Sequence, residues 1–72
     1  MKIVFTNHAK YRMIERGIPA EYVRQTIKNP EQKRLDEYGM IIARKKFNNN
    51  ILEIVYRLRG VTYVIITLYY EN

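Results

Sequence analysis

The chain has 72 residues, 47% of them hydrophobic and 28% charged, so it forms one small globular domain over residues 1–72 and cannot hold a separate cofactor domain. The absence of cysteine excludes a disulfide framework and the usual structural zinc site, and it favours a cytoplasmic location. Thirteen Lys and Arg against seven Asp and Glu give a net charge of +6, which favours a polyanionic partner, most often nucleic acid.

The first part of the chain predicts a strand followed by a helix. The short apolar run Ile3 to Phe5 suits a strand at the edge of a sheet, and Thr6 or Asn7 suits the N-cap of a helix that runs to about Arg16. Gly17 follows where helices often end in a left-handed conformation. The side chains of this helix expected to face the core are Ala9, Met13 and Ile14.

A second helix is predicted from Pro19 to about Asn29. Proline suits the first helical position because its fixed φ matches the helix. The pair Asn29-Pro30 ends the helix, because a residue before proline avoids the helical conformation. The apolar stripe of this helix consists of Tyr22, Val23, Thr26 and Ile27.

The second half predicts four strands joined by tight turns. Glycine and asparagine, which tolerate the positive φ of hairpin turns, separate the strands. Along the third of these strands apolar and polar side chains alternate, so one face is expected to meet the helices. The predicted strands are Gln32 to Tyr38, Met40 to Phe47, Ile51 to Leu58 and Val61 to Tyr70.

These elements define the fold class. We expect an α+β fold with two N-terminal helices packed on one face of an antiparallel four- to five-stranded sheet, in the order β-α-α-β-β-β-β. The last strand is apolar on both faces, which places it in the interior of the sheet or beneath a second subunit.

The first predicted helix carries a candidate phosphate site. The only histidine, His8, is followed at intervals of four residues by Arg12 and Arg16. Four residues advance a helix by about 6 Å and turn it by about 40°, so the three side chains form a slanting ridge. Guanidinium groups and a helix N-terminus both favour phosphate, and neutral imidazole is a general base at physiological pH. The alternative is structural: the histidine hydrogen-bonds locally, and the arginines pair with Glu15 or lie in solvent.

The same residues carry a family resemblance. The segment His8 to Ile18, HAKYRMIERGI, resembles the signature His-Ala-x-x-Arg-Met-x-x-Arg-Gly-Ile of a family of small domains of unknown function. The resemblance continues through a second helix that ends near Asn-Pro to a last strand that reads like Val64 to Tyr69. The plan of that family is similar to the RelE/ParE and BrnT-like toxins of toxin–antitoxin systems, several of which are metal-independent ribonucleases.

The resemblance implies roles in RNA cleavage. Attack by the ribose 2′-hydroxyl needs a base, cations that stabilise the phosphorane and an acid for the leaving oxygen. His8 would serve as base or acid, and Arg12 and Arg16 would hold the phosphate. Tyr69 near the end of the last strand, or Tyr56 on its neighbour, would stack on a base or donate a hydrogen bond. The chain departs from RelE-type ribonucleases at the end of the last strand, which has tyrosines but no Arg or His.

A basic sheet surface is a second candidate site. Arg44 and Lys46 share one face of a predicted strand, and Arg57 and Arg59 share one face of its neighbour. Such a surface predicts salt-dependent nucleic-acid binding. The alternative is that these charges protect the sheet from aggregation. The pair Lys33-Arg34, flanked by acidic residues, is interpreted as a solvated edge.

The sequence therefore favours a RelE-like, toxin-type protein that acts on RNA, with metal-independent cleavage as its expected chemistry. We expect no metal site and no cofactor, because there is one histidine, no cysteine and no Walker or dinucleotide motif. No apolar run approaches the roughly 18 residues of a membrane helix, so no membrane partner is expected. An antitoxin and a homodimer are candidate partners. The alternative is a non-catalytic module that binds nucleic acid or protein.

Overall fold

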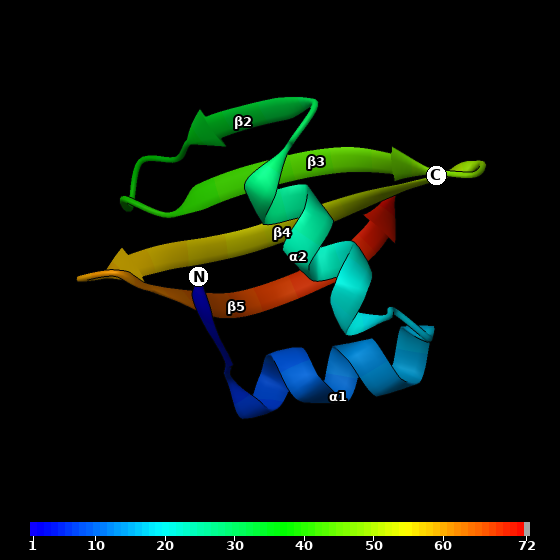
Figure 1. Ribbon diagram of the computed structural model, residues 1–72, viewed down its shortest axis with the longest axis horizontal. Helices are drawn as coiled ribbons and strands as arrows, with labels where there is room; N and C mark the ends of the chain where they lie inside the picture. Colours follow the sequence, from blue (N-terminus) through cyan, green and yellow to red (C-terminus); the bar gives the residue numbers. More distant parts are fainter. Residues whose placement is uncertain (72) are drawn as a thin grey trace.

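Residues 1–71, which the computed structural model describes, form two helices on one face of a five-stranded sheet (Figure 1). The order of elements confirms the predicted α+β fold. None of the helices within these residues is long and apolar enough to cross a membrane. The elements are β1 (Lys2–Phe5), α1 (Asn7–Arg16), α2 (Ala20–Lys28), β2 (Gln32–Leu35), β3 (Ile41–Phe47), β4 (Asn50–Arg59) and β5 (Thr62–Glu71).

The sheet has the strand order β1-β5-β4-β3-β2 and is mixed. Strands β2 to β5 form the predicted antiparallel meander, but β1 pairs with β5 in parallel. The parallel pair arises because the helices carry the chain from β1 at one edge to β2 at the other, and the meander then returns it beside β1 (Figure 1). Strand β5 thus lies between two neighbours, which confirms its predicted interior position.

Local interactions at the capping residues set the ends of both helices. The Thr6 hydroxyl accepts a hydrogen bond from the Ala9 amide and caps α1, while Gly17 ends it in the left-handed region with φ 63°. Pro19 differs from its predicted role: it has an extended ψ of 145°, so it is the N-cap of α2 and not the first helical residue. The predicted end of α2 is confirmed, since Asn29 is its C-cap.

The core lies between the helices and the sheet. Ala9 of α1, Val23 of α2 and Ile54 of β4 are fully buried there. Tyr22 stacks on Phe47 of β3 with ring centroids 4.0 Å apart, which fixes α2 on the sheet. The prediction that Ile14 faces the core was wrong: it is 83% exposed, because one residue beyond Met13 turns the side chain about 100° away from the buried stripe.

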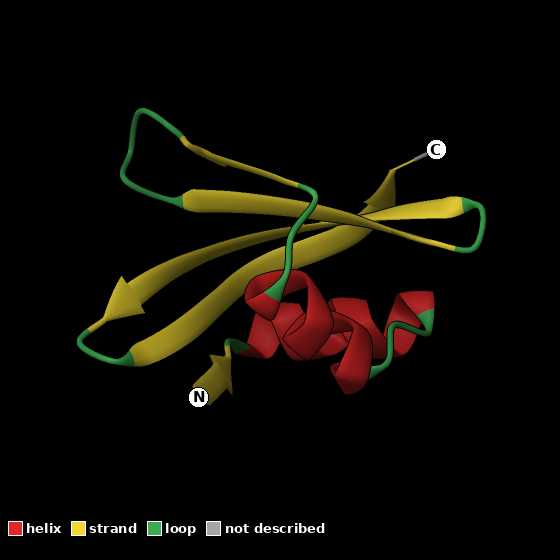
Figure 2. Ribbon diagram, turned by 45° about the horizontal axis from the view of Figure 1, so that its top comes forward, coloured by secondary structure: helices red, strands yellow, loops and turns green. Residues whose placement is uncertain are grey.

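The other face of the sheet, which we call the open face, carries no helix (Figure 2). Alternation along β4 places Leu52, Ile54 and Tyr56 on the helix side and the intervening residues on the open face, as predicted. Strand β2 is shorter than predicted because the Asp36 carboxylate accepts hydrogen bonds from the amides of Tyr38 and Met40 and holds residues 36–40 in a turn.

Candidate nucleic-acid interface

Strand register places a charged cluster on the open face, near the end of β5. Arg44 of β3 lies opposite Glu53 of β4 and opposite Gln32 of β2. Its Nε atom is 3.4 Å from Glu53 Oε1, and a terminal nitrogen donates to Gln32 Oε1 at 2.9 Å. The other terminal nitrogen contacts the Glu71 carboxylate at the end of β5. One guanidinium thus joins four strands.

Glu53 is the buried anion of this cluster, with only 6% of its surface exposed. It lies opposite Tyr69 of β5, whose hydroxyl donates a hydrogen bond to Glu53 Oε2. That hydrogen bond, followed by burial of the phenol, raises the pKa of Tyr69 to about 12. The Arg44 Nε atom is enclosed and makes no hydrogen bond within the described residues, so its contact with Glu53 is an ion pair alone.

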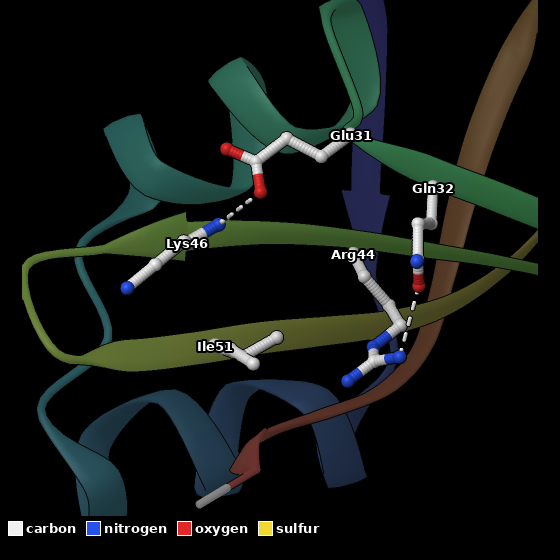
Figure 3. Close-up of a pocket in the computed structure, with 5 residues that line it drawn as sticks. All are labelled: Glu31, Gln32, Arg44, Lys46 and Ile51. Carbon is white, nitrogen blue, oxygen red and sulfur yellow. Dashed lines mark hydrogen bonds between the residues drawn. The ribbon is translucent and has the colours of Figure 1, made fainter.

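Two adjoining cavities flank Arg44. One, of about 230 Å³, lies towards the β3–β4 turn, where the Glu31 carboxylate accepts a hydrogen bond from the Lys46 amide (Figure 3). The other, of about 340 Å³, reaches Glu53. Both are lined by Gln32 and Arg44, so we treat them as one depression, the open-face groove. Its lining residues are Glu31, Gln32, Lys33, Arg34, Ile42, Arg44, Lys46, Ile51, Glu53 and Glu71.

The four residues predicted to bind nucleic acid share the open face but divide into two groups. Arg44 and Lys46 line the groove, whereas Arg57 and Arg59 lie on β4 near the β4–β5 turn. Arg57 is four residues along β4 from Glu53, the partner of Arg44, a separation of about 13 Å. Both Arg57 and Arg59 are exposed.

The structure does not bring the four predicted catalytic residues together: three lie on α1, and the Tyr69 hydroxyl lies on the open face. His8 Nε2 lies 3.0 Å from the Thr67 hydroxyl of β5, so the imidazole is held beside the part of β5 that extends beyond its pairing with β1. Arg12 and Arg16 share the Glu15 carboxylate, with nitrogen–oxygen distances of 3.0 and 3.7 Å. No hydrogen bond within residues 1–71 joins the Tyr69 hydroxyl to this helix, because that hydroxyl is bonded to Glu53 on the open face.

Sequence reasoning missed the groove's acidic residues. Glu53 is the one carboxylate within the otherwise apolar run Ile51 to Tyr56, which is a signal for a buried ion pair. Its partner depends on a register that the sequence does not reveal. Arg34 is exposed on the edge strand β2, as predicted, and it also lines the groove. The described residues contain no cluster of three or more side chains suited to a metal ion.

Comparison with known proteins identifies a family. The family described as Domain of unknown function (DUF4258) matches residues 5–70, which covers both helices and almost all of the sheet. No match was found among curated proteins or among solved structures.

Proposed function

The chain belongs to the DUF4258 family, whose function is unknown, and from that premise we propose that it is a toxin-type protein that binds RNA through the open-face groove. The observation that carries the proposal is the groove itself: Arg34 and Lys46 line it beside the glutamate-paired Arg44, on a sheet face without a covering layer. Guanidinium groups bind phosphate through paired hydrogen bonds, and lysine adds a point charge.

The groove favours a single strand of nucleic acid. A strand with unstacked bases fits a shallow depression on a sheet, as in other sheet-based RNA-binding domains. The half-buried Ile51 side chain offers apolar surface to a base, while the cations meet the backbone. The net charge of +6 supports the same partner through long-range attraction.

Neutralising the groove is expected to weaken RNA binding. We predict that replacing Arg34 and Lys46 with glutamine weakens binding to a fluorescein-labelled single-stranded RNA of about 12 nucleotides. The slope of log Kd against log salt should fall by about 1.4, since each lost phosphate contact on a single strand removes about 0.7. Fluorescence polarisation across a salt series measures both quantities.

The matched control replaces Lys10 and Lys28, exposed lysines on the two helices, with glutamine. It removes the same charge from the opposite side of the molecule. Equal losses in the two double variants would contradict the proposal, because they would reflect net charge and not the groove. Wild-type protein that does not bind the RNA would contradict it outright.

Metal-independent RNA cleavage is a second candidate function, favoured by the contact between His8 Nε2 and Thr67. The hydrogen bond orients the imidazole beside the free amides of the α1 N-terminus, which favour a phosphate. In this proposal Arg12 releases Glu15 and contacts the scissile phosphate. The proposal extends the resemblance to RelE-like toxins and involves no metal or cofactor.

A cytoplasmic setting and a protein partner complete the proposal. An antitoxin, or a second copy of the chain, would cover exposed apolar side chains. Tyr11 and Ile14 on the outer side of α1 are 61% and 83% exposed, and burial of such side chains stabilises complexes. The same observation supports the alternative of a protein-interaction module.

A further inference from the structure

Strand pairing brings Lys2 beside two arginines that are remote in the sequence. On the open face Lys2 of β1 pairs with Thr62 of β5, and Thr62 pairs with Arg59 of β4. The next open-face row joins Val4, Val64 and Arg57 in the same way. Because neighbouring strands are about 4.8 Å apart, Lys2 and Arg59 lie about 10 Å apart across Thr62.

We call Lys2, Arg57 and Arg59 the β1–β4 cluster. Unlike most other arginines of the chain, these cations have no ion-pair partner within the described residues. Within residues 1–71, Arg12, Arg16, Arg24 and Arg44 are all in ion pairs with glutamates. Lys2, Arg57 and Arg59 are exposed, and no carboxylate in the same residues lies within ion-pair distance of them. Their three charges are therefore concentrated at one end of the open face, without a counter-ion among residues 1–71.

The surface between the cations suits a sugar–phosphate backbone. Thr62 offers a hydroxyl between Lys2 and Arg59, and hydroxyl groups commonly donate to phosphate oxygens. Val4, in the same row as Arg57, is 39% exposed and offers apolar surface beside the cations. Lys2, Arg57 and Arg59 do not line the open-face groove, and they lie on an exposed surface. Such a surface fits an extended polyanion that passes over it better than a small molecule that needs enclosure.

We propose that the β1–β4 cluster is a second phosphate-binding site, which holds the same single strand of RNA at phosphates beyond those that the groove contacts. The inference rests on the proposed function and adds the path of the RNA. The strand runs along β4, from the groove near Glu53 to the β4–β5 turn. The separation of about 13 Å between Glu53 and Arg57 means that the two sites contact different phosphates.

The test is a triple variant in which Lys2, Arg57 and Arg59 become glutamine, measured with the labelled RNA of about 12 nucleotides across a salt series. We expect the salt slope to fall by about 2, from three lost contacts at about 0.7 each. A second variant with Arg57→Lys and Arg59→Lys keeps the charges and is expected to keep the slope. Circular dichroism spectra that match the wild type verify folding, and all replaced side chains are exposed.

The control variant replaces Lys10, Arg24 and Lys28 on the helices with glutamine and so removes the same charge. If the slope of log Kd against log salt falls equally in both triple variants, the β1–β4 cluster is not a phosphate-binding site. A different outcome is that the triple variant of the β1–β4 cluster keeps the wild-type slope while the double variant of Arg34 and Lys46 in the groove loses affinity. In that case the inference fails and the proposed function stands. Absence of RNA binding by the wild type overturns the proposed function itself.

Discussion

Replacing Glu53 with alanine is expected to lower the free energy of unfolding by about 3 kcal/mol, at the lower end for a broken buried ion pair. The side chain of Glu53 is 8% exposed and that of Arg44 is 29% exposed, so the guanidinium would lose its central anion while still reaching solvent. The Tyr69 hydroxyl would lose its acceptor as well. Domains of this size are stabilised by only about 5–15 kcal/mol, so urea unfolding should show a large shift of the midpoint.

Glu21→Ala is the matched control. Glu21 also pairs with an arginine, Arg24, at 3.1 Å, but both side chains are more than half exposed, so the loss should be below about 1 kcal/mol. Glu53→Gln preserves the shape of the side chain and an acceptor for the Tyr69 hydroxyl. Its loss in free energy of unfolding is expected to fall between those of Glu53→Ala and Glu21→Ala. Equal stability of Glu53→Ala and the wild type would show that the charged cluster does not organise the open face.

If the protein cleaves RNA, His8→Ala is expected to lower the cleavage rate by about 10² to 10⁴, the usual contribution of a general acid or base. The assay incubates RNA with purified protein in chelator and follows products by gel electrophoresis. Thr67→Val keeps the imidazole but removes its hydrogen bond, so it should cause a smaller loss through misorientation.

Lys10→Ala, a substitution of a neighbouring exposed residue on α1, serves as the preparation control and is expected to cleave as the wild type does. Cleavage that persists in His8→Ala would point to a contaminating nuclease or to another site. RNA left intact by the wild type across pH would contradict the enzymatic proposal and leave binding as the function.

Local signals in the sequence predict the elements of this fold well. Thr6 and Gly17 bound α1 because a hydroxyl cap and a left-handed glycine act within one turn. The alternation at Leu52, Glu53 and Ile54 predicts the two faces of β4. The parallel pairing of β1 was not predicted, because strand order depends on how the helices cross the sheet and not on any residue in β1.

Less of the candidate site than of the fold could be predicted from the sequence. Basic residues on alternate positions are visible in the chain, but their counter-ions are set by register between strands. Arg44 contacts Glu71 across 27 positions of sequence. Register likewise places Lys2 and Arg59 on either side of Thr62. Spacing along α1 predicted the ridge of His8, Arg12 and Arg16, yet it did not predict that His8 would contact Thr67.

The most direct test of RNA binding on the open face is a titration of methyl-labelled protein with the single-stranded RNA, followed by NMR. Ile42, Val55 and Val64 carry methyl groups on the open face, whereas Ile14 is exposed on α1. We predict chemical-shift changes at the open-face methyls and none at Ile14. Changes confined to Ile14, with the open-face methyls unmoved, would contradict the account.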